Sequence, residues 1–194
     1  MPPRLRLVAT QVPRGARVLD VGCSDGRLLA WLRDEQGVDG RGIEIDAERV
    51  ADAVARGLSV VQGDADRDLA AFPSDSVDIA ILSEALQAMH RPAAVLQELL
   101  RIGRQAVVAF PNFGHWRVRA ALALGGRMPA TPSLPANWHE TENIHLCTVS
   151  DFRALAADLG FPILREAHLA GERPVSPAQA NWRADHALFL LGRG

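Results

Sequence analysis

A short loop rich in glycine and polar residues follows the first apolar run of the chain. It contains Asp20, Gly22, Cys23, Ser24 and Gly26. Glycine at a turn from a strand into a helix lets a ligand approach the backbone closely, and the first turn of the helix offers unpaired N–H groups. The loop therefore predicts a ligand-binding site at the carboxyl end of a strand.

An acidic residue, Glu44, ends the second predicted strand, close to the ~20-residue offset at which a carboxylate binds the hydroxyls of a ribose. A carboxylate can accept both hydroxyl protons, and it would repel the 2′-phosphate of NADP. The dinucleotide-binding pattern G-x-G-x-x-G also requires glycine where this chain has Ser24 and Arg27. These observations argue against an NAD(P)-dependent enzyme.

The spacing Asp20-x-Gly22-x-Ser24-x-Gly26 resembles the D-x-G-x-G-x-G loop of class I S-adenosylmethionine (SAM)-dependent methyltransferases, with Ser24 in place of the middle glycine. The resemblance implies SAM or S-adenosylhomocysteine as the ligand. It also implies that Asp64, which follows the third predicted strand, accepts a hydrogen bond from the adenine amino group. The predicted cofactor-binding residues are Asp20, Gly22, Cys23, Ser24, Gly26, Glu44 and Asp64.

A second polar cluster lies just beyond the fifth predicted strand. It consists of Asn112, His115, Trp116, Arg117 and Arg119. In α/β proteins, ligands bind at the carboxyl ends of strands, whereas Trp and Arg are the residue types that anchor protein interfaces. The cluster is therefore predicted to form either an acceptor pocket or a partner-docking surface. A polar loop in which a buried Trp anchors the next helix is the structural alternative.

Four segments outside the glycine-rich loop resemble the MetW family of methionine biosynthesis proteins. They read ILSEALQA at 81–88, FPNFGHWRVR at 110–119, GGRMP at 125–129 and NIHLCTVSDF at 143–152. The likeness covers nearly the whole chain. It implies a protein of the homoserine acylation step, partnered by a homoserine O-acetyl- or O-succinyltransferase of the MetX type. It also implies a methyltransferase fold for which no methyl acceptor is established.

The residues themselves leave catalysis open. The chain contains neither Lys nor Tyr, and it lacks an Asn-Pro-Pro-aromatic motif and a Pro-Cys loop. The leading candidates for a base are His115 and His145, and the other possible bases are His90, His139, Glu84 and Glu140. Two hypotheses therefore stand: a SAM-binding partner or regulator of the acyltransferase, or a SAM-dependent methyltransferase that acts on a small molecule. We predict no metal site.

These residues need a scaffold of alternating strands and helices. Apolar runs predict strands at 17–21, 42–45, 58–62, 77–82, 106–110, 163–169 and 186–191, with helix-period segments between most of them. We predict an α/β Rossmann-like class I methyltransferase fold, with a seven-stranded, mostly parallel sheet, an antiparallel last strand and helices on both faces. Residues 127–147 contain several prolines and show no period, so we expect them to be mobile or ordered by a ligand or partner.

Length and charge narrow the remaining possibilities. The 194 residues suffice for one hydrophobic core, so we expect a single domain, 1–194. The net charge of −2 offers no basic excess for a phosphate backbone, which argues against a nucleic-acid partner. No apolar run approaches the ~18 residues of a membrane span. The two cysteines, in a chain without a recognisable export signal, predict a reducing, cytoplasmic location.

Overall fold

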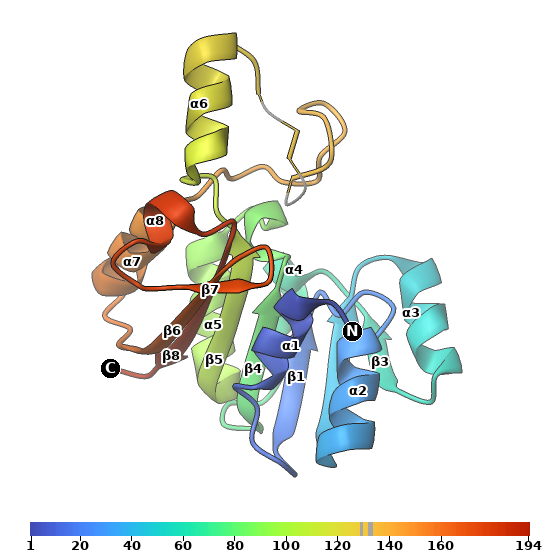
Figure 1. Ribbon diagram of the computed structural model, residues 1–194. Helices are drawn as coiled ribbons and strands as arrows, with labels where there is room; N and C mark the ends of the chain where they lie inside the picture. Colours follow the sequence, from blue (N-terminus) through green and yellow to red (C-terminus); the bar gives the residue numbers. More distant parts are fainter. Residues whose placement is uncertain (129, 132–133) are drawn as a thin grey trace.

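The computed structural model describes residues 1–128, 130–131 and 134–194. A mixed sheet forms its centre (Figure 1). Within the described residues the sheet has eight strands in the order β3-β2-β1-β4-β5-β8-β6-β7. The parallel strands are β1 (Arg17–Val21), β2 (Asp39–Glu44), β3 (Ser59–Gln62), β4 (Val77–Ser83) and β5 (Gly103–Pro111). This arrangement confirms the predicted fold class.

The carboxyl-terminal strands complete the sheet. β8 (His186–Gly192) lies antiparallel between β5 and β6 (Ile163–Ala170), and β7 (Arg173–Val175) pairs with β6 in a hairpin. The sequence predicts seven strands, and the structure adds one to them. The added strand, β7, is only three residues long and contains Pro174, so its own sequence carries no strand signal. Its pairing follows from the turn at Gly171, which adopts a φ of 62°.

Helices cover both faces of the sheet because successive strand residues point to opposite sides. One face packs against α1 (Pro3–Ala9), α2 (Arg27–Gln36) and α3 (Ala47–Ala55), and the other packs against α5 (Pro92–Ile102) and α7 (Val149–Asp158). Thus Val18 packs in the core on the side of α1, α2 and α3, and its neighbour Leu19 packs in the core on the side of α5 and α7. The remaining helices of the described chain are the short α4 (Ala65–Asp68), η1 (Leu69–Ala71), η2 (Leu86–Ala88) and α8 (Ala180–Arg183), and the longer α6 (Trp116–Gly125).

The start of α7 is held by its cap. The N-cap is Thr148, whose side chain accepts from the backbone N–H of Asp151 while the Asp151 carboxylate accepts from the N–H of Thr148. This reciprocal pair is a capping box. It fixes the point at which the chain rejoins the body after the irregular segment.

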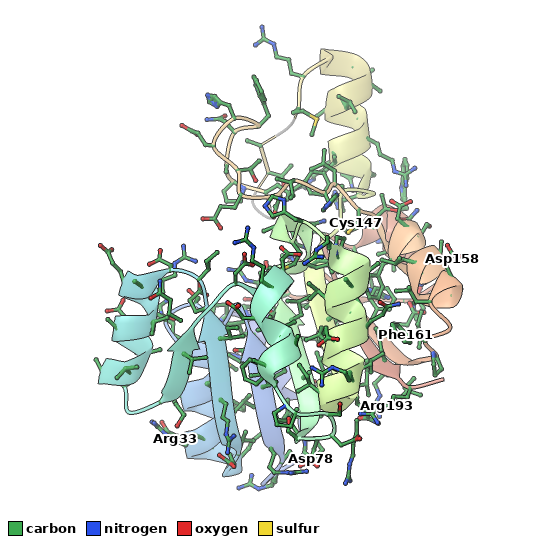
Figure 2. The ribbon with its side chains drawn as sticks, turned by 180° about the vertical axis from the view of Figure 1, so that it is seen from behind. Arg33, Asp78, Cys147, Asp158, Phe161 and Arg193 are labelled. Carbon is green, nitrogen blue, oxygen red and sulfur yellow. The ribbon has the colours of Figure 1, made fainter. Side chains whose placement is uncertain are left out.

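Helix α6 stands apart from the two helical layers, at the end of the molecule where β5 terminates (Figure 1). Residues 127–147 return from it to α7, and the described part of this segment contains no helix or strand beyond a bridge between Thr131 and Leu134. Whether the segment is mobile stays a prediction, and residues 129, 132 and 133 lie outside the described residues. Figure 2 shows Cys147 where this segment meets the body, whereas Arg33 and Asp78 lie at the opposite end.

Candidate functional site

A cavity of about 500 Å³ opens at the carboxyl ends of the parallel strands. Among the predicted cofactor-binding residues, those that line it are Asp20, Gly22, Cys23, Ser24, Glu44 and Asp64. They come from the ends of β1, β2 and β3, which lie side by side in the sheet. Gly26 does not line the cavity; it forms the N-cap of α2. The volume lies within the range of about 300–1,000 Å³ that is typical of small-molecule sites.

The glycine-rich loop turns sharply through three residues in the left-handed region: Gly22, Ser24 and Gly26 have φ values of 70°, 52° and 74°. A Cβ on Gly22 would lie 2.9 Å from the Cβ of Ala85, and one on Gly26 would lie 2.3 Å from Leu58 Cδ1. Glycine is therefore needed at both positions. Ser24 adopts the same conformation with a small side chain, which explains how it can replace the middle glycine of the motif.

The Glu44 carboxylate connects this loop to the end of β2. It is only 5% exposed. Its Oε2 accepts from the N–H of Ser24 at 2.8 Å, and its Oε1 accepts from the N–H groups of Ile45 and Asp46 at 2.9 and 3.1 Å. An ionised carboxylate has about four acceptor positions. Glu44 therefore shapes the loop and retains capacity for a hydroxyl donor from a ligand in the cavity.

Asp64 also has a structural role. It is the N-cap of α4, where its carboxylate accepts from the N–H of Asp66 at 2.9 Å and lies 3.5 Å from Arg67 Nε. Its neighbours Gly63 and Ala65 line the cavity as well. The capping interaction holds the carboxylate at the end of β3, in the lining of the same cavity as the glycine-rich loop.

Asp20 is buried at the base of the cavity. Burial, reinforced by the nearby Glu44 carboxylate, raises its pKa from 3.8 to about 7. Burial also raises the pKa of the Cys23 thiol well above its ordinary value, so Cys23 is a packing residue rather than a nucleophile. The cavity floor therefore carries one carboxyl group that titrates near neutral pH.

Replacing Asp20 by Asn should change how stability depends on pH. The folded-state pKa lies above the unfolded one, so the stabilising contribution of protonated Asp20 is complete below about pH 4 and is lost as the pH rises through about 7. The Asn variant cannot ionise. Its free energy of unfolding, relative to the wild type, should therefore rise by more than about 1 kcal/mol between about pH 5 and about pH 8.

Urea denaturation across this pH range tests the expectation. Asp52→Asn, an exposed change on α3, is the matched control and should leave the pH dependence of the wild type unaltered. A constant difference between the Asp20 variant and the wild type would contradict the assignment.

The opposite wall of the cavity comes from segments that sequence reasoning only partly identified. Glu84 and His90, two of the possible bases, both line it. Glu84 follows β4 with a φ of 66°, and its carboxylate lies 2.8 Å from His186 Nε2 and 4.0 Å from Arg4 Nε. The further lining residues that the sequence did not indicate include Arg4, Leu5, Ser83, Glu142 and Asn143. They come from α1, the end of β4 and the irregular segment, which are far apart along the chain.

The leading catalytic candidates lie elsewhere. His115 is the N-cap of α6, where its Nδ1 accepts from the N–H of Arg117 at 3.2 Å, and partial burial lowers its pKa. His145 lines a separate, smaller cavity of about 200 Å³ with Leu86, Gln87 and Phe152. The structure therefore does not place either histidine beside the glycine-rich loop.

The second polar cluster separates into a buried residue and an exposed group. Asn112 is 1% exposed; its Nδ2 donates to the carbonyl of Ala184 at 2.8 Å, and its Oδ1 accepts from the N–H groups of Gly114 and Val149. This position gives Asn112 a structural role at the base of the cluster rather than a place on its surface. The acceptor or docking role of Asn112, inferred from its place just beyond the fifth strand, stays a prediction.

The other members of the cluster remain near the surface. Trp116 is exposed and stacks with the guanidinium of Arg117, 5.4 Å from its ring centre. The guanidinium of Arg119 lies 5.4 Å from the ring centre of Trp182, and its Nε donates to the carbonyl of Gly114. The side chains of these three cluster members, and that of Trp182, lie outside the lining of the large cavity. Their position favours a surface role over an acceptor pocket.

The strand order, the antiparallel β8 and the loop after β1 define a class I SAM-dependent methyltransferase fold. Solved structures agree. A SAM-dependent methyltransferase from Mesorhizobium loti superposes with a TM-score of 0.72 at 21% identity, covering 98% of this chain and 96% of that one. A TehB-like SAM-dependent methyltransferase from Corynebacterium glutamicum gives 0.66 at 18% identity, covering 100% and 89%.

The chain belongs to the MetW family: the family model for methionine biosynthesis protein MetW matches residues 3–191. The bifunctional methionine biosynthesis protein MetXA/MetW of Rhodopirellula baltica is 34% identical over an alignment of 194 residues that covers 94% of this chain and 31% of that protein. This chain thus spans about a third of the length of that relative. The resemblance seen in the sequence is confirmed. Within the described residues, no helix has the length and apolar character to cross a membrane.

Proposed function

We propose that the large cavity binds SAM or S-adenosylhomocysteine. The observation that carries this proposal is that the glycine-rich loop, Glu44 and Asp64 line one cavity of about 500 Å³ at the carboxyl ends of adjacent strands. Glu44 would accept from the ribose, and Asp64 would accept from the adenine amino group. The left-handed turn through Gly22 would bring the backbone close to the ligand.

We further propose that the protein acts in the cytoplasm as a partner and regulator of a homoserine O-acetyl- or O-succinyltransferase. Membership of the MetW family and the relative whose name joins MetXA to MetW support this role. SAM is made from methionine, so a SAM-binding partner on an early acyl-transfer step would report the level of the end product. Such regulation requires SAM to bind the free and the partnered protein with different affinities.

The direct test measures turnover of the homoserine acyltransferase with and without this protein, across a titration with SAM. We expect turnover to change when the protein is added. We also expect SAM to shift the affinity of the complex by about 5- to 150-fold, the range of ordinary allosteric coupling. Turnover that does not change when the protein is added would refute the partner role. A complex whose affinity does not change with SAM would refute only the sensing role.

A small-molecule methyltransferase is the second candidate. One observation favours it: the Glu84 carboxylate lines the cavity and is hydrogen-bonded to His186, as a positioned base would be. SAM would supply the methyl group, and Glu84 would hold a proton of the acceptor. Formation of S-adenosylhomocysteine from SAM in the presence of a small-molecule acceptor, lost in Glu84→Gln with SAM binding retained, would support this candidate over the first.

A further inference from the structure

Helix α6 has almost no core of its own. Of its ten described residues only Val118 is buried, whereas Leu124 is 90% exposed and Leu122 is about half exposed. Figure 1 shows the helix projecting beyond the sheet rather than lying on it. Isolated helices of this length are marginal in water, because most helical stability in proteins comes from packing of an apolar face. Because α6 lacks such packing within the described chain, its exposed apolar side chains are available to pack against a partner.

The irregular segment adds apolar side chains at the same end of the molecule. Trp138 is 75% exposed, and Ile144 and Leu146 are about half exposed. In the described part of the chain, seven of the twelve exposed large hydrophobic residues lie between 116 and 146. We call these seven the α6 surface: Trp116, Leu122, Leu124, Met128, Trp138, Ile144 and Leu146. Such a concentration of exposed apolar side chains marks an interaction site.

The charge of α6 and of the chain up to His139 is one-sided. The sequence from Gly103 to His139 contains no Asp or Glu, whereas Arg117, Arg119 and Arg127 lie on or beside α6. Glu140 and Glu142 follow at the far end of the α6 surface. Trp and Arg, both present here, are the residue types that contribute most to binding at protein interfaces. The helical part of the α6 surface therefore fits an apolar groove with an acidic rim, the mode in which a partner receives a helix.

We propose that the α6 surface docks this protein onto the homoserine acyltransferase, with α6 seated in an apolar, acid-rimmed groove of that enzyme. The inference rests on the proposed function and specifies its interface. The relative that joins MetXA to MetW in one chain supports this occupant, because such a fusion keeps the two parts together at high effective concentration. The MetW-like part accounts for 31% of that chain, which leaves most of its length for the acyltransferase part.

The docking surface is continuous with a wall of the cofactor cavity. Glu142 and Asn143 line the cavity, and the next two residues, Ile144 and His145, donate their N–H groups to the carbonyl of Gln87 at 2.8 and 3.0 Å. Gln87 belongs to η2, whose flanking residues Ala85 and Met89 line the same cavity. A ligand in the cavity and a partner on the α6 surface would thus contact one continuous segment, which gives a physical route for coupling between them.

The test uses the full-length protein and measures its affinity for the purified acyltransferase by calorimetry. The double variant Leu124→Glu/Trp138→Glu places acidic charge on the α6 surface and should weaken the complex by about 30-fold or more. Leu164→Glu, at a 51% exposed position on β6, is the matched control and should bind like the wild type. Unchanged S-adenosylhomocysteine binding and melting temperature would show that the double variant is folded. The milder double variant Leu124→Ala/Trp138→Ala removes the same apolar side chains without adding charge, and it provides a second measurement of the affinity.

The outcomes are distinct. If the wild type binds the acyltransferase and both double variants bind equally well, the docking surface is wrong while the partner role stands. If the wild type does not bind the acyltransferase at all, the partner role and the docking proposal fail together. If sedimentation shows a wild-type dimer that either double variant dissociates, the α6 surface is covered by a second copy of this chain instead, and the proposal is overturned.

Discussion

Replacing Glu44 by Gln should weaken S-adenosylhomocysteine binding by about 10- to 100-fold. The Glu44 carboxylate borders the cavity and accepts from the N–H of Ser24, which orients the glycine-rich loop. The amide of Gln is nearly the same size, but it carries no charge and one of its two polar atoms can only donate. Hydrogen bonds to charged groups contribute about 1.5–3 kcal/mol, which corresponds to this range of affinity.

Isothermal titration calorimetry measures the effect directly. Glu48→Gln is the matched control, because Glu48 is an exposed residue at the start of α3 that does not line the cavity. The control should bind like the wild type. An unchanged affinity in Glu44→Gln would remove Glu44 from the binding site, and an absence of wild-type binding at millimolar ligand would remove the site itself.

Replacing Asn112 by Ala should destabilise the protein by about 3–5 kcal/mol. The side chain links three elements: Oδ1 accepts from the N–H of Gly114 at 2.9 Å and of Val149 at 3.2 Å, and Nδ2 donates to the carbonyl of Ala184. Alanine would leave these buried groups without their partner. Each unsatisfied buried polar group costs about 1–3 kcal/mol, so the combined loss is large even if part of it is recovered by water.

The unfolding midpoint in urea reports this loss. Asn137→Ala provides the control, since Asn137 is exposed and its side chain donates to Glu140 three residues away. We expect the control to change stability by less than about 1 kcal/mol. If the Asn112 variant were equally stable but failed to bind the acyltransferase, Asn112 would be a docking residue, as its sequence position first suggested.

Most of the fold could be predicted because its signals are local. The strands at the centre of the sheet are short apolar runs, and each alternates with a segment whose period matches a helix. β7 could not be predicted in this way, since its three residues owe their strand conformation to pairing with β6. The start of α7 could not be assigned from the sequence either, because Thr148 and Ser150 are both capping residue types and only the reciprocal bond with Asp151 selects Thr148.

The sequence by itself determined the near wall of the cavity. Gly22 and Ser24 follow β1 and Glu44 ends β2, and the carboxyl ends of parallel strands necessarily meet at one edge of a sheet. Only the tertiary structure decided the far wall, where Arg4, Glu84 and Asn143 converge from segments up to 139 positions apart. It likewise decided that Asn112 is buried while Trp116 is exposed, because polarity and size do not specify burial where a chain leaves the sheet. The local pattern of residue types predicts which residues share a helix or strand, whereas long-range packing decides which helices and strands contribute to one site.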